Sequence, residues 1–366
     1  MAVRSGFEFT LEGGCARGGR PRNGAKNFRR LQIGWYLSLI WCRVPDSRSQ
    51  KARERLTLKP LMNSANTSGD SKDKQGKETK ADDFGSDPNK ALFSIFLPDK
   101  CRNDGTETEK RGDKEFYKRI VYDFGDGIKA RFVLVPNLRP NDPPNFYMME
   151  NKVTILTFRQ FAENQKSKAY IKSDEWRKGA KAGGKDLGID NPALPMTGVV
   201  VDDAYLFAVT MGGNLPTVKQ WDKAAGRFEP NHPPGPYQTP WSLEDDKNKD
   251  QIAIERGDIG PLEAGKATKD VSPFGCRDMA ANGREWTRDL FLLGSGTDRE
   301  VPLNRPTNNY KDRVILRGRN YVEDKPLKFT DTSMGSERPD TLGYAETRFD
   351  VGFRVVIEIP EKFQPK

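Results

Sequence analysis

Side chains that could catalyse a reaction or bind a metal ion are few in this chain. Its four cysteines are Cys15, Cys42, Cys101 and Cys276, and its single histidine is His232. The cysteines show no CxxC spacing and are too sparse for a disulfide framework. Zinc and iron sites draw on several thiolates or imidazoles, so a histidine-based metal centre is hard to build from this chain alone. We expect His232, in the segment Pro-Asn-His-Pro-Pro-Gly, to be an exposed loop residue.

Oxygen-bearing side chains gather instead between residues 274 and 289. Asp278, Asn282, Glu285 and Asp289 stand there among glycines and alanines and beside a tryptophan. Small residues let the backbone pass close to its neighbours, and the tryptophan supplies apolar anchorage. The pattern predicts a buried turn. Carboxylate and amide oxygens on a tight turn are also the ligands that a hard cation such as Ca²⁺ requires.

Short strands and helices must position this turn. Two β-rich runs, 116–124 and 128–136, flank a Gly-Asp-Gly turn and predict a hairpin. Residues 166–190 are charged and glycine-rich, which predicts an exposed excursion, and residues 229–270 are expected to form a long loop. Further strands are expected at 146–154, 199–201, 314–320 and 350–356. Three helices are expected as well. The first covers 157–164, the second runs from Ala204 onward with Asp202 or Asp203 as its N-cap, and the third runs from its N-cap Thr217 to Gly226.

The formal net charge of +9 is an N-terminal property. Residues 1–60 carry 13 Lys or Arg and 4 Asp or Glu, whereas residues 61–366 carry 48 of each. A domain that binds nucleic acid presents a basic patch, so we expect no nucleic acid partner for the folded part. Residues 1–90 are first basic and then polar, which predicts a mostly disordered tail. The ordered domain is expected at 91–362.

A short apolar run at 31–42 interrupts the tail. It follows Arg29-Arg30 and precedes Arg43, which is typical of a signal-peptide core or a weak membrane anchor. In that case the protein is extracytoplasmic, and this run would be its membrane contact. The alternative is that the run belongs to an upstream extension, that Met62 is the natural start, and that the protein is cytoplasmic.

Five segments, taken in order, resemble one known family. Residues 274–289 are similar to FGLYDMxGNVWEWTxD, the signature of the formylglycine-generating (sulfatase-modifying factor) domain family. Residues 146–164 resemble its FYIxKYEVTNxQYxxFxxA, and residues 213–226 its GRLPTExEWExAARG. The strand 132–136 is similar to FVLIP and the strand 351–356 to VGFRVA. The resemblance implies an α+β, C-type-lectin-like fold: small twisted antiparallel sheets with two main helices and many ordered loops.

The same resemblance sets an expectation about catalysis. The family's oxidising enzymes convert a sulfatase cysteine to formylglycine with molecular oxygen and a copper ion, which a pair of cysteines holds because thiolates are soft ligands. That pair is expected between 321 and 349, where this sequence has no cysteine. A second oxidising branch of the fold uses iron bound by histidines, and His232 is the only histidine. Copper is therefore unexpected here, and Cys276 is interpreted as a small buried hydrophobic residue.

The resemblance also implies a structural calcium ion. Asn282, Gly283 and Glu285 match the positions at which relatives bind it, and this metal site is our prediction for the turn. In the alternative, Asn282 caps the turn and Glu285 pairs with an arginine such as Arg317. The family's second calcium site has no confident match here.

Two hypotheses for function follow. In the first, the protein is a non-oxidase paralogue, a calcium-supported module that binds a small ligand, a protein or a sulfatase-like peptide. In the second, it is an enzyme, either a formylglycine-generating oxidoreductase that works without the cysteine pair or a catalyst of another reaction on the same scaffold. Four arginines near the C-terminal strands could line an anionic pocket or form ion pairs instead: Arg317, Arg319, Arg348 and Arg354.

Overall fold

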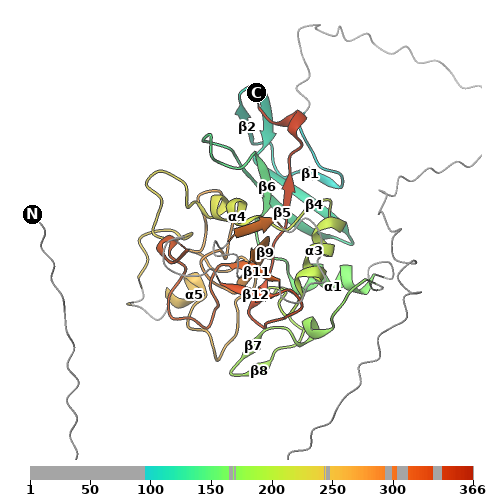
Figure 1. Cartoon of the computed structure of the whole chain (residues 1–366), viewed down its shortest axis with the longest axis vertical. Helices are drawn as coiled ribbons and strands as arrows, with labels where there is room; N and C mark the ends of the chain where they lie inside the picture. The colour runs from blue at the N-terminus through green and yellow to red at the C-terminus, as the bar shows by residue number, and fades with distance from the viewer. Residues whose placement is uncertain are drawn as a thin grey trace, which may run out of the picture. The chain divides into compact units, whose positions relative to one another are not determined.

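A five-stranded antiparallel sheet forms one half of the folded domain (Figure 1). In the computed structural model, the described residues are 95–365 without 165–167, 169, 243, 245–247, 293–298, 303–311 and 333–339, so the predicted tail 1–90 lies outside them. The predicted hairpin is confirmed, because two of the strands pair across Gly125-Asp126-Gly127. In sheet order the strands are β1 (Cys101–Asn103), β4 (Arg119–Gly125), β5 (Ile128–Val135), β6 (Phe146–Met149) and β14 (Val356–Glu358).

This sheet contributes to a hydrophobic core on each of its two faces. Along β5, Phe132 and Leu134 belong to a large core, and Val133 and Val135 belong to a smaller core on the other side. We call these the first core and the second core. Because side chains alternate across a strand, the run of apolar residues in β5 supplies both.

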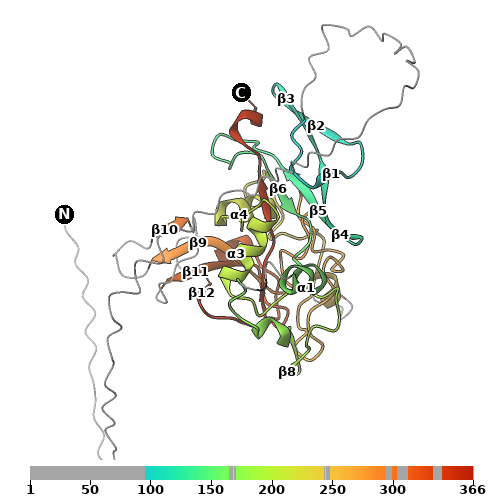
Figure 2. The ribbon, with the colours of Figure 1, turned by 90° about the vertical axis from the view of Figure 1, so that its right-hand side faces the viewer.

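A second sheet is built on the stretch after the predicted turn. Its strands run in the order β10 (Arg299–Pro302), β9 (Arg284–Leu292), β11 (Arg313–Arg317) and β12 (Thr341–Gly343), and β13 (Val351–Gly352) pairs with β9 in parallel. Figure 2 shows these strands on one side of α3, with α1 on the other.

The predicted single strand at 350–356 is wrong in detail, because the chain changes sheets within it. Strand β13 pairs with β9 of the second sheet, and β14 pairs with β6 of the first. Between them the carbonyl oxygens of Phe353 and Val355 accept hydrogen bonds from the amides of Val153 and Met149. The residues from Val351 to Glu358 therefore connect the two sheets.

Two of the predicted helices begin earlier than expected. Helix α1 (Ile155–Glu163) starts after its N-cap Thr154, whose hydroxyl accepts from the amide of Thr157. Helix α3 (Val201–Thr210) includes Asp202 and Asp203 in its first turn, so neither is the N-cap, and its N-cap Val200 makes no side-chain bond. The predicted strand 199–201 does not form, because Val199 and Val201 pack into the first core and Val201 is already the first residue of α3.

The third predicted helix is confirmed with both of its ends. Helix α4 (Val218–Ala225) has a capping box between Thr217 and Gln220 and stops at Gly226, whose φ of 91° is left-handed. Trp221 of this helix is fully buried. The remaining elements are α5 (Lys249–Ile252), η2 (Glu175–Lys178), η4 (Phe329–Thr332), η5 (Glu361–Phe363) and the hairpins β2 (Thr108–Arg111) with β3 (Lys114–Tyr117) and β7 (Lys181–Ala182) with β8 (Lys185–Asp186).

Of the two predicted loop regions, one agrees with the structure and the other differs in part. Among its described residues, the long region 229–270 carries only the short helix α5, as expected. The excursion 166–190 is not wholly exposed, because Trp176 of η2 inserts into the first core, where its ring packs on that of Phe158. None of the helices in the described part of the chain has the length and apolar character that a membrane crossing requires.

Candidate functional site

The turn predicted from residues 274–289 exists and is buried. Asn282 and Gly283 both adopt left-handed backbone angles, with φ of 60° and 105°. A Cβ atom on Gly283 would lie 3.1 Å from the carbonyl oxygen of Asp350, so glycine suits both the angle and the space. These two residues turn the chain into β9, whose second residue is Glu285.

Glu285 is the centre of a buried ion network. Its carboxylate accepts from the guanidinium of Arg354 at 2.6 and 2.8 Å, from Nζ of Lys152 at 2.6 Å and from the indole Nε1 of Trp221 at 3.2 Å. The side chains of Glu285, Lys152 and Arg354 are all at most 1% exposed. The alternative that Glu285 pairs with an arginine is therefore correct, but the arginine is Arg354 rather than Arg317.

Burial and the charges of neighbouring groups shift the pKa values of these side chains in opposite directions. Burial alone would raise the pKa of Glu285, but the charges of Arg354 and Lys152 outweigh it and lower that pKa to about 2. Burial lowers the pKa of Lys152, while Glu285 acts to raise it. For Arg354 burial also acts to lower the pKa, yet the Glu285 carboxylate raises it overall. Each charge depends on the others to stay ionised inside the protein.

The three residues predicted to bind calcium already have protein partners. The carbonyl oxygen of Gly283 accepts from Nζ of Lys152 at 2.9 Å. Oδ1 of Asn282 accepts from the amide of Leu262 at 2.9 Å, and its Nδ2 donates to the Leu262 carbonyl at 3.1 Å. As arranged, these donors do not fit a divalent cation, since one would have to displace the Lys152 ammonium. Calcium binding stays a prediction.

Two further carboxylates lie close to the network. Asp278 and Asp270 are fully buried, and burial raises the pKa of each. Oδ1 of Asp278 has no hydrogen-bond partner among the residues that the structure describes, whereas Asp270 accepts from the backbone amides of residues 279–281. Within the described residues, no group of three or more His, Cys, Asp or Glu side chains is arranged to hold a metal ion.

The described thiols are far apart in the fold. Cys101, at the start of β1, packs against the first core, and Cys276 is fully buried in the second core, so they lie on opposite faces of the five-stranded sheet. Burial raises the pKa of each thiol to about 12, so both stay protonated at neutral pH. The interpretation of Cys276 as a small buried hydrophobic residue is confirmed.

The four C-terminal arginines form ion pairs rather than a pocket. Each has at least one carboxylate within 3.0 Å, and Arg317 reaches Asp222 of α4 at 2.9 Å. His232 is exposed, as expected, and the described part of the chain places it in no group of three or more metal-binding side chains. The acidic residues that the family motif has in α4 are replaced here by Val218 and Gln220, and Gln220 serves the capping box instead.

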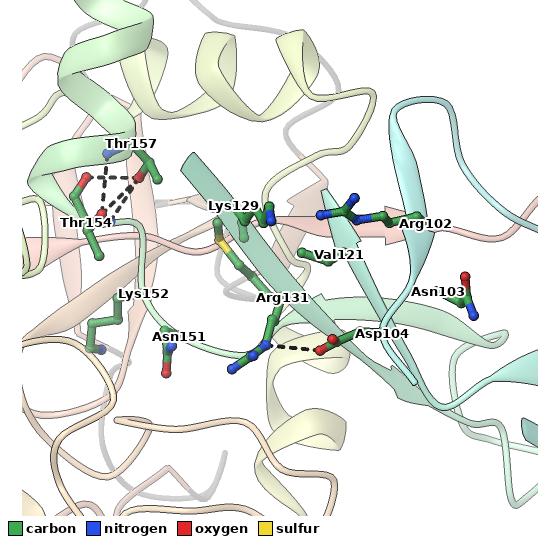
Figure 3. A pocket seen from close by; sticks show the side chains of 12 residues that line it. Arg102, Asn103, Asp104, Val121, Lys129, Arg131, Asn151, Lys152, Thr154 and Thr157 are labelled. Atoms are coloured by element: carbon green, nitrogen blue, oxygen red, sulfur yellow. Dashed lines mark hydrogen bonds and ion pairs between the residues drawn. The ribbon is translucent and has the colours of Figure 1, made fainter. Parts of the chain in front are cut away.

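A hollow of about 350 Å³ lies between the first sheet and the start of α1 (Figure 3). Lys129 and Arg131 of β5 alternate with Ala130 and Phe132 of the first core, so they extend from the opposite face of the sheet. Arg102 of β1 lies in the same cross-strand row as Arg131, with Val121 of β4 between them.

The charge of this hollow is mostly positive. Arg131 pairs with Asp104 at 3.0 Å, and Arg102 lies 3.8 Å from Asp123. Among the described residues, the Lys129 ammonium has no hydrogen-bond or ion-pair partner. Sequence reasoning missed this site, although alternation of cations with apolar residues at 129–132 is a signal that could have shown it.

Comparison with known proteins identifies the family. The model of the sulfatase-modifying factor enzyme 1-like domain matches residues 138–359, which is more than half of the chain, so this protein belongs to that family. The described sheets and helices agree with its α+β fold. The comparison with curated proteins found no match.

Solved structures of similar fold include two from bacteria. Treponema denticola variable protein 1 is 15% identical with a TM-score of 0.41, over 65% of this chain and 98% of that one. PvdO from Pseudomonas aeruginosa is also 15% identical with a TM-score of 0.41, over 66% and 94%. CarF is 16% identical with a TM-score of 0.36, over 59% and 87%.

Proposed function

We propose that this domain is a binding module on the sulfatase-modifying factor scaffold and not a formylglycine-generating oxidase. The observation that carries the proposal is the separation of Cys101 and Cys276 by the five-stranded sheet. A copper site built from paired cysteines needs two thiolates that converge on one ion. Two protonated thiols in different cores cannot supply it without unfolding the sheet between them.

The basic hollow supports an anionic ligand. Arg102, Lys129 and Arg131 line it with one carboxylate, that of Asp104, and the ammonium of the fourth cation, Lys152, is already bonded to Glu285. Guanidinium and ammonium groups bind carboxylate and phosphate oxygens through charge-assisted hydrogen bonds. A small carboxylate or phosphate compound is thus the ligand class that this site favours, whether free or as part of a peptide.

The hydroxyls at the start of α1 add little to such a site. Thr154 and Thr157 line the hollow, but their side chains bond each other and the first turn of the helix. The amides of Ile155 and Leu156 donate to the carbonyls of Leu194 and Pro192. Binding would therefore depend on the three cations, and above all on Lys129.

Calorimetric titration of the full chain with inorganic phosphate and with a small dicarboxylate tests the ligand class. We expect weak binding of both and none of glycerol. Loss of one charge-assisted bond of about 1.5 kcal/mol weakens binding about tenfold, which is the result expected for Lys129→Gln. Lys110→Gln on β2, outside the hollow, is the matched control. Equal affinity of the two variants would refute the assignment of the site.

The enzyme hypothesis has its own test. Oxygen consumption is followed with copper and a Cys-x-Pro-x-Arg peptide, and mass spectrometry monitors the peptide thiol. We expect no turnover and no stoichiometric copper. Formation of formylglycine would overturn the proposal, and would require a copper site not made from a cysteine pair.

A further inference from the structure

Lys152 has an unusual position for a lysine. Its side chain is 1% exposed, and its Nζ lies between the carbonyl oxygen of Gly283, at 2.9 Å, and Oε1 of Glu285, at 2.6 Å. Lysine is almost never fully buried unless it is paired. The two oxygens that hold it belong to two of the three residues predicted to bind a calcium ion.

From this contact we infer that the Lys152 ammonium occupies the cation position of the turn 282–285, so that the folded domain needs no metal ion there. A carbonyl oxygen and a carboxylate are the hard donors that either an ammonium or Ca²⁺ can use. Two positive groups, Lys152 and Arg354, already contact the carboxylate of Glu285 directly. A divalent ion added beside these two cations would meet strong repulsion in a buried site of low dielectric constant.

The backbone holds Lys152 in this place. It lies between β6 and α1, and the neighbouring Val153 donates to the Phe353 carbonyl and accepts from the amide of Met196. The first bond fixes the segment against residues 351–358, which connect the two sheets, and the second fixes it against the segment that precedes α3. The lysine side chain is thereby directed at β9, where Glu285 stands.

The sequence gives an independent reason to place the Lys152 ammonium at this cation position. When Thr154 is matched to the threonine of FYIxKYEVTNxQYxxFxxA, Lys152 falls on the glutamate of that motif. A glutamate here would place a second carboxylate beside Glu285 and Gly283, and two carboxylates with a carbonyl oxygen attract a divalent cation. Lys152 instead places a positive charge at this position, and it forms an internal ion pair with Glu285.

The experiment compares melting temperatures of the full-length wild type, Lys152→Glu and Lys152→Arg, each with chelator and with added calcium chloride. Lys178→Met, which removes an exposed lysine, is the matched control. We expect the melting temperature of the wild type, and likewise that of the control, to be the same with chelator as with calcium. Lys152→Glu should melt lower with chelator and recover with millimolar calcium, and Lys152→Arg should remain insensitive to calcium.

Three results would overturn the inference. One is a fall in the wild-type melting temperature on chelation that calcium reverses. Another is a folded Lys152→Glu protein that calcium does not stabilise at any concentration. The third concerns a Lys152→Glu protein that does not fold with chelator and is then refolded with calcium. Recovery of the fold only with calcium supports the inference, whereas no recovery in either condition contradicts it. The outcome is independent of the proposed binding function, which rests on the thiols and the hollow.

Discussion

Replacing Glu285 with glutamine keeps the shape of the side chain and removes the charge at the centre of the buried network. Lys152 and Arg354, both inside the protein, would then face each other without a counter-charge. Breaking a buried ion pair by removing one partner costs about 3–5 kcal/mol. For a domain of this size each kcal/mol shifts the melting temperature by about 2–4 °C, so we expect a fall on the order of 10 °C for Glu285→Gln.

The pH dependence of stability gives a second measure of what the charge of Glu285 contributes to the free energy of unfolding. The pKa of Glu285 falls from 4.5 to about 2 on folding, which corresponds to about 3 kcal/mol of stability at neutral pH. Because the folded state has the lower pKa, this contribution is fully present above pH 4.5 and is lost as the pH falls towards 2. The difference between wild type and Glu285→Gln should shrink over that interval.

Urea unfolding at pH 7 and at pH 3 measures both effects. Glu175→Gln, which removes an exposed carboxylate that pairs with Lys178, is the control and should change stability by less than about 1 kcal/mol. A Glu285→Gln protein within about 1 kcal/mol of wild type at pH 7 would refute the reasoning, because the network would then contribute no more than a surface ion pair.

Three other predictions concern separate parts of the domain. Cys101 and Cys276, with pKa values of about 12, should react with iodoacetamide at pH 8 much more slowly than the same thiols in the urea-unfolded chain, and equal rates would contradict their burial. Asp222→Asn leaves the buried Arg317 without its partner and should cost about 3 kcal/mol in urea unfolding, so a stability equal to wild type would count against this pair. Burial raises the pKa of Asp203 to about 6, so the NMR resonance of its carboxyl carbon should titrate near that pH. Its ionisation should reduce the stability of the domain as the pH rises from 4 to 6. A titration midpoint near 4 would refute this prediction.

Local patterns allowed several features to be predicted from the sequence. The hairpin around Gly125-Asp126-Gly127 and the helix between Thr217 and Gly226 are encoded by turn and capping residues that lie within a few positions of each other. The buried turn at Asn282 was visible for the same reason. Each depends on short-range geometry, which a single sequence shows directly.

The missed features depend on residues far apart in the chain. Lys152 and Glu285 are 133 residues apart, and nothing local to Lys152 marks it as buried. Trp176 lies in a charged, glycine-rich segment, and its burial depends on contacts outside that segment, such as the one with Phe158 of α1. Residues 199–201 have the composition of a strand, but tertiary packing overrides that preference at the start of α3.

The connection between the sheets has a consequence for how the protein is made. Strand β13 completes one sheet and β14 the other, and Arg354 stands between them. During synthesis on the ribosome, neither sheet has its last strand, and Glu285 has no guanidinium partner, until residues 351–358 have emerged. The nascent domain therefore cannot complete either sheet before these residues are made, and a chain that ends before them would leave the buried carboxylate of Glu285 without its guanidinium partner.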